Sequence, residues 1–200
     1  MNNLEYLNQI SKTSRPVKTG GNAQGFGTIT KIAIAGVAVF IILLIVGMLI
    51  GKKADNTSTL GPQIYLRSTN LASTINTYNR SLRSSKLRSI GLTLSSTLTA
   101  AINQLDPTFR SSATKDKNLS TSETEYITEL NDTLNNAKLN GMLDRTYANQ
   151  MQLQTALLLS MLEQAINHTT DENLKTIYLQ YQSNLATTNT DLVNYSSSSD

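Results

Sequence analysis

The stretch Lys31–Lys53, KIAIAGVAVFIILLIVGMLIGKK, decides how the rest of the chain is organised. Between its flanking lysines, the twenty residues from Ile32 to Gly51 carry no charge, and thirteen of them are Ile, Leu, Val or Phe. An α-helix rises about 1.5 Å per residue, so the run spans roughly 30 Å, the thickness of a bilayer's hydrocarbon core. The run therefore predicts a transmembrane helix over residues 32–51, represented along its length by Ile32, Phe40, Leu44 and Gly51.

The ends of this run indicate a permanent anchor rather than an export signal that is removed. A secretory signal has an apolar region of about 7–15 residues, followed by small residues at the cleavage site. The run here is longer and ends in Lys52-Lys53, with no such site after it. We therefore interpret it as the uncleaved signal-anchor of a single-pass protein of the cell membrane.

Charges beside the span predict its orientation. Within twenty residues, four Lys or Arg precede the span and three follow it. Because cytoplasmic flanks carry the excess of Lys and Arg, this favours a cytoplasmic N-terminus and an extracytoplasmic C-terminal domain. Gly47 and Gly51 form a GxxxG pair, which lets two spans approach closely. The predicted partners are therefore the lipid bilayer and either another protein or a second copy in a weak homodimer.

Composition divides the rest of the chain. Gly and Pro interrupt residues 1–31, which predicts a flexible cytoplasmic tail. Residues 52–61 are polar and predict a linker. Residues 62–192 carry apolar side chains at helical spacing and predict an extracytoplasmic helical bundle. The serine-rich residues 193–200 predict a disordered tail.

Two apolar stripes predict the first helices of the bundle. Pro62 suits a first helical turn, where its missing N–H costs nothing. One stripe runs from Ile64 to Leu82 and the second from Leu87 to Leu105, with a turn or kink predicted at Ser84-Ser85. Asp106-Pro107 predicts a stop, because the residue before a proline is disfavoured in the helical region. Residues 107–119 are then expected to form a polar loop.

Helix-end signals predict the later helices. Ser122 and Glu125 fit a capping box at a helix start, and Asn140-Gly141 fits a helix end. Further helices are predicted from Asp144 to Asn167 and from Thr170 to Leu192. Since no segment alternates with period two, we predict an all-α fold: one N-terminal transmembrane helix followed by an antiparallel bundle of four or five helices.

Candidate catalytic and ligand-binding groups are few. The chain has no cysteine, which excludes disulfides and zinc–thiolate sites, and its one histidine, His168, is best explained as a helix C-terminal residue. A di-iron site would need a Glu-x-x-His motif on each of two helices, and no P-loop or dinucleotide fingerprint occurs. Glu123, Glu125 and Glu129 are expected to cap and solvate a helix. We therefore predict no catalytic, metal or cofactor site and no enzyme.

The charge is split along the chain. Residues 52–117 hold ten Lys or Arg and three acids, whereas residues 118–200 hold three Lys or Arg and ten acids. The basic side chains Arg80, Arg83, Lys86 and Arg88 have two competing explanations. They contact an anionic surface near the membrane, or they pair with the acidic later helices inside the bundle. Nucleic acid is not an expected partner, because the segment lacks interleaved aromatic residues.

These features predict a membrane-anchored protein that displays a helical bundle for structural, attachment or partner-binding work. The alternative is a sensory or solute-binding bundle that signals through a membrane partner. In layout, such a bundle resembles the ligand domains of chemoreceptors.

Overall fold

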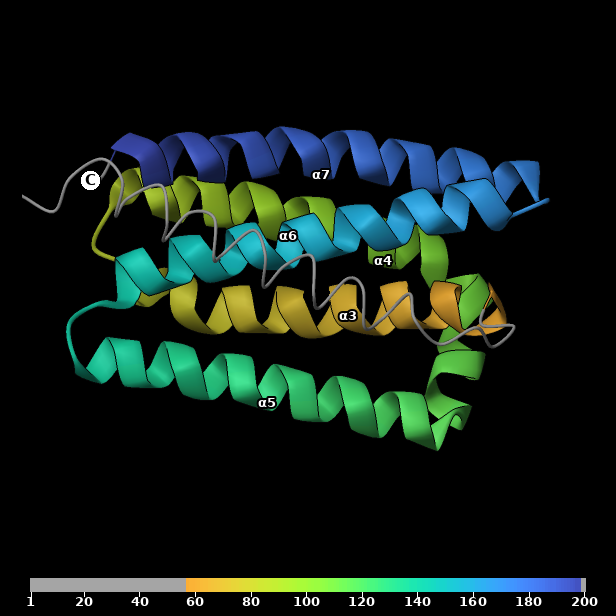
Figure 1. Cartoon of the computed structure of the whole chain (residues 1–200), viewed down its shortest axis with the longest axis horizontal. Helices are drawn as coiled ribbons and strands as arrows, with labels where there is room; N and C mark the ends of the chain where they lie inside the picture. Colours follow the sequence, from red (N-terminus) through yellow and green to blue (C-terminus); the bar gives the residue numbers. More distant parts are fainter. Residues whose placement is uncertain (1–56, 199–200) are drawn as a thin grey trace, which may run out of the picture. The chain divides into compact units, whose positions relative to one another are not determined.

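The computed structural model describes residues 57–198, which form five α-helices and a short 3₁₀ helix (Figure 1). The elements are α3 (Thr57–Tyr78), η1 (Asn79–Ser81), α4 (Ser85–Lys115), α5 (Lys117–Leu139), α6 (Leu143–His168) and α7 (Glu172–Ser198). No strand occurs within residues 57–198. The predicted all-α bundle is therefore confirmed, with five helices. The predicted tail 1–31 and transmembrane helix 32–51 lie outside the described residues.

Successive helices run antiparallel, with α3 packed among α4, α5 and α6 (Figure 1). α7 packs on α4 and α6, and α5 packs mainly on α3 and α6. The bundle therefore has two ends. We call the end with Thr57, the α4–α5 turn and the α6–α7 turn the entry end, and the opposite end, with η1 and the α5–α6 turn, the distal end. No helix within residues 57–198 has the length and apolar character needed to cross a bilayer.

Apolar side chains from all five helices meet in one core. Burying a large aliphatic side chain contributes about 1.5–3 kcal/mol, so this cluster supplies most of the favourable free energy of folding. The two predicted stripes are confirmed, because they supply the buried faces of the α3 segment and of α4. Each helix contributes at least one fully buried residue, such as Ile64, Leu94, Leu134, Leu158 and Leu185.

The predicted stop at Asp106-Pro107 and the predicted loop over residues 107–119 are wrong. α4 continues through Pro107 to Lys115. Two contacts hold the turn around the proline: the Tyr65 hydroxyl donates to Asp106 Oδ1 over 2.5 Å, and Arg110 Nε lies 2.8 Å from the same oxygen. Ala113 is fully buried one turn further on. Tertiary contacts therefore outweigh the local cost of a proline inside a helix.

The predicted capping box at Ser122 and Glu125 is also wrong. α5 begins five residues earlier, at Lys117, and Asp116 is its N-cap. The Asp116 carboxylate accepts a hydrogen bond from Leu119 N over 3.0 Å, which satisfies a free N–H of the first turn.

The outer limits of the bundle also differ from the prediction. α3 begins at Thr57, so residues 57–61 of the predicted linker are helical and Pro62 lies inside the helix rather than in its first turn. α7 continues to Ser198, which corrects the predicted disorder over residues 193–198. Leu192 is fully buried and Tyr195 packs against the core, which extends the helix beyond its predicted end.

Three predicted turns are confirmed. Ser84 caps α4, and its hydroxyl accepts from Leu87 N over 3.2 Å. Gly141, at φ +72°, ends the α5 segment in a conformation that favours glycine. Asp171 accepts from the N–H groups of Asn173 and Leu174 at the start of α7.

Candidate functional site

The four predicted basic residues gather at the distal end of the bundle. Arg80 lies in η1, Arg83 in the turn after it, and Lys86 and Arg88 in the first turns of α4. All four side chains are exposed. α3 has 22 residues, so roughly 33 Å separate Thr57 from this end. These cations follow the apolar run closely in the sequence, but in the bundle they lie at the end opposite Thr57.

The four predicted cations are not among the close ion pairs of the described residues. The ion pairs within residues 57–198 join Arg67 with Glu123, Arg110 with Asp106, and Lys175 with Glu172. None of Arg80, Arg83, Lys86 and Arg88 forms an ion pair with a carboxylate in this part of the chain. Lys86 instead lies over the Tyr195 ring, with its Nζ 6.0 Å from the ring centroid.

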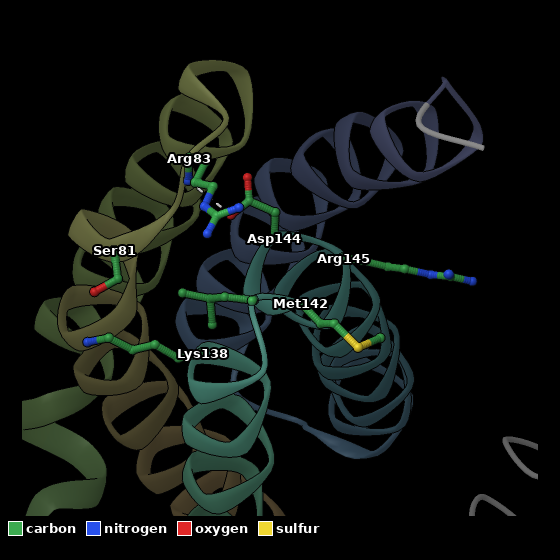
Figure 2. A pocket seen from close by; sticks show the side chains of 8 residues that line it. Ser81, Arg83, Lys138, Met142, Asp144 and Arg145 are labelled. Atoms are coloured by element: carbon green, nitrogen blue, oxygen red, sulfur yellow. Dashed lines mark hydrogen bonds between the residues drawn. The ribbon is translucent and has the colours of Figure 1, made fainter.

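A pocket of about 420 Å³ opens beside these cations (Figure 2). It lies between the η1–α4 turn and the α5–α6 turn. Its lining residues are Ser81, Arg83, Lys138, Gly141, Met142, Leu143, Asp144 and Arg145. Folding therefore adds two cations, Lys138 and Arg145, to an end of the molecule that already holds the four predicted ones.

Asp144 joins the two turns that make the pocket. Its Oδ1 accepts from Arg83 N over 2.9 Å, and its Oδ2 accepts from Ser84 N over 2.7 Å. Because both oxygens are engaged by backbone donors at the start of α4, this carboxylate acts as a helix cap supplied by another helix. Figure 2 shows Lys138 extending toward Ser81, whereas Arg145 points away from the pocket.

Two large apolar side chains are exposed at the same end. Leu139 is 77% exposed at the end of α5, and Met142 is 54% exposed in the turn that follows. Lys138 and Arg145 flank them in the chain. We call Lys138, Leu139, Met142 and Arg145 the distal tip. An apolar pair rimmed by cations is a surface that favours an amphipathic or anionic partner.

A second polar cluster lies in the core and was not predicted. Arg67 of α3 donates to both carboxylate oxygens of Glu123 of α5, over 2.9 Å from Nε and 2.7 Å from Nη2. Arg67 is 7% exposed and Glu123 is 2% exposed. Gln63 donates to Glu123 Oε1 over 2.9 Å, and the Tyr126 ring centroid lies 4.0 Å from Arg67 Cζ. We call these four residues the buried network.

The buried network is built to hold helices rather than to react. The Glu123 carboxylate accepts three hydrogen bonds, which leaves little capacity for proton transfer. The Tyr126 hydroxyl donates to Gln154 Oε1 over 2.8 Å, which extends the contacts to α6. The expectation that Glu123 solvates an exposed helix face is therefore wrong.

A signal in the sequence could have revealed the network. Glu123 lies four residues before Ile127 and seven before Leu130, on the apolar stripe of its helix. Arg67 lies between Ile64 and Leu71 on the stripe of α3 in the same way. A charged residue on each of two apolar stripes predicts a buried pair.

The other candidate side chains stay apart. His168 is the last residue of α6, as predicted, and its side chain is exposed; Glu125 and Glu129 are exposed on α5. The span residues Ile32, Phe40, Leu44 and Gly51 lie outside the described part of the chain. Comparisons of the chain with protein-family models, curated proteins and solved structures find no match. Within the described residues, the features that bear on function are the distal end and the buried network.

Proposed function

We propose that this is a single-pass membrane protein that displays an extracytoplasmic helical bundle for attachment, scaffolding or partner binding. The observation that carries the proposal is the uncharged run from Ile32 to Gly51, which ends in Lys52-Lys53 shortly before the bundle begins at Thr57. Thirteen of its residues each contribute roughly −0.3 to −0.6 kcal/mol on an insertion scale, so the run favours the bilayer by several kcal/mol.

The bundle supports a display role because it buries its own apolar stripes. Its core closes among α3, α4, α5, α6 and α7. The buried network adds a satisfied polar contact that fixes α5 against α3. The bundle therefore needs no lipid to complete its core, and its exposed distal end is left available for contact with a partner.

The sensory alternative has one observation in its favour. The distal pocket, at about 420 Å³, falls in the range of small-molecule sites, and the cations Arg83 and Lys138 line it. An anionic solute that raises the melting temperature of the protein would support sensing. An unchanged melting temperature across a panel of carboxylates and phosphates would leave the display role.

Membrane retention tests the anchor. We expect the full-length chain to stay in the membrane fraction through high salt and alkaline carbonate, and to leave it only in detergent. Replacing both Phe40 and Leu44 with Arg costs about 5–7 kcal/mol of insertion free energy and should release the protein. Phe40→Leu with Leu44→Ile is the matched control, because it changes the same positions and keeps them apolar.

Two results would contradict the proposed membrane anchor. Release of the unaltered chain by carbonate would overturn the proposal. So would a mature protein whose N-terminus lies near Ala54, since that would show the run to be a cleaved signal.

A further inference from the structure

The distal end concentrates positive charge in a bundle that is neutral as a whole. Residues 57–198 hold eleven Lys or Arg and eleven Asp or Glu. Six of the cations are exposed at the distal end: Arg80, Arg83, Lys86, Arg88, Lys138 and Arg145. Of the acids toward this end within residues 57–198, Asp144 is engaged by two backbone N–H groups, and Asp132 and Asp191 are exposed. An anionic surface approaching this end therefore meets an excess of positive charge.

The exposed apolar pair lies at the α5–α6 turn, which projects from the bundle in Figure 1. Met142 lines the distal pocket and Leu139 does not, so the two side chains do not share one apolar groove. A bound peptide would be held by a concave apolar groove. Apolar side chains on a projecting turn, flanked by Lys and Arg, instead suit the interface of a bilayer, where they enter the headgroup region and the cations face phosphates.

We propose that the distal end docks on an anionic lipid surface, with Leu139 and Met142 entering the headgroup region and the six cations contacting phosphate or carboxylate headgroups. This inference rests on the proposed function, because the anchor determines which membrane is available. The distal end lies roughly 33 Å from Thr57, where the chain enters the described bundle. The proposal commits to a second, apposed bilayer as the occupant, which makes the protein a tether.

Vesicle capture tests the tether with the full-length chain. The protein is reconstituted into neutral phosphatidylcholine vesicles, and the donors are mixed with fluorescent acceptor vesicles. We expect the donors to capture acceptors in which about a third of the lipid is phosphatidylserine and to ignore neutral acceptors. Capture should weaken as salt is raised, because the screening length shortens from about 10 Å at 0.1 M to about 3 Å at 1 M.

Variants of the distal tip locate the contact. Each cation near an anionic surface raises binding by up to about fivefold, so Lys138→Gln with Arg145→Gln should lower capture by up to about 25-fold. Leu139→Ser with Met142→Ser should lower it as well. Lys115→Gln with Lys117→Gln is the matched control, because it removes the same charge from exposed positions at the entry end and should leave capture unchanged.

The outcomes separate this inference from the proposed function. Donor vesicles that fail to retain the chain would overturn the anchor. Donors that retain the chain but capture anionic and neutral acceptors equally, or neither, would overturn the tether alone. An equal loss of vesicle capture in the entry-end control would also overturn the tether. Binding of polyglutamate without capture of vesicles would overturn it as well and would point to an acidic protein partner.

Discussion

Gly91 is a position where the absence of a side chain is required. It lies in α4, and a Cβ atom built there would meet Asn79 Oδ1 and come within 2.8 Å of Tyr147 Oη. Both of these oxygens are buried, and neither has a hydrogen-bond partner within the described part of the chain. The three groups therefore meet at a crowded polar point in the core, where Gly91 lets η1 and α6 approach α4.

Gly91→Ala should accordingly destabilise the bundle. Inside a helix, replacing glycine with alanine ordinarily stabilises by about 0.5–1 kcal/mol. Here the overpacked Cβ should cost about 1–3 kcal/mol, which reverses the sign. Urea denaturation of the fragment 54–200 measures the change, with Ser89→Ala as a control at an exposed position of the same helix. A gain in stability from Gly91→Ala would show that the contact relaxes freely.

Three buried tyrosines make stability depend on alkaline pH. Burial raises the pKa of Tyr178 to about 12 and raises the pKa of Tyr147 and of Tyr181 still further above the ordinary value. Because each side chain is neutral when protonated, the folded state keeps these protons at a pH where the unfolded chain releases them. The contribution of these tyrosines to the free energy of unfolding is therefore complete below about pH 10 and is lost as the pH rises toward about 12 and beyond.

Urea denaturation across this range checks the prediction. We expect the free energy of unfolding to fall steeply above about pH 10, together with a late rise in tyrosinate absorbance. An unchanged free energy of unfolding up to about pH 12 would mean that water reaches these hydroxyls.

Among the helices, α5 is unusual because its first half is held by a buried ion pair, whereas its second half is held by apolar contacts. Among its residues 117–129, Glu123 is the one buried side chain, and the buried apolar residues Leu130, Leu134 and Ala137 come later in the helix. The first half of α5 therefore depends on the Arg67–Glu123 pair for its position against α3.

Breaking that pair should release the first half of α5. Glu123→Leu leaves the Arg67 guanidinium buried without a carboxylate, which should cost about 3–5 kcal/mol. Amide exchange should accelerate over residues 117–129 more than in α6. The double change Arg67→Met with Glu123→Leu should recover most of the loss, because apolar replacement of a whole buried pair is often neutral or stabilising. If the double variant is no more stable than Glu123→Leu alone, the network contributes more to stability than the desolvation of its charges costs.

An element could be predicted from the sequence where its signal is local, and could not where it depends on contacts between residues far apart in the chain. α6 was placed within one residue at each end, because its apolar stripe and the glycine turn before it are local features. The continuation of α4 past Pro107 was missed because it depends on Tyr65 and Ala113, which no local pattern connects with the proline. The four cations of the site were identified from their charge alone. Lys138 and Arg145 were not, because only folding brings the α5–α6 turn beside the start of α4.

The described bundle as a whole has two unlike ends. The chain enters the described bundle at Thr57, whereas the exposed cations Arg80, Arg83, Lys86 and Arg88 and the distal tip lie roughly one helix length away. The distal end therefore offers the charged, partly apolar surface that the proposed attachment role requires.

Protease treatment of intact cells that carry the protein with a tag at each end tests this arrangement most directly. We expect external protease to remove the C-terminal tag and to digest the bundle, while the N-terminal tag survives on a short fragment that contains residues 32–51. Survival of both tags, or loss of the N-terminal tag alone, would contradict it.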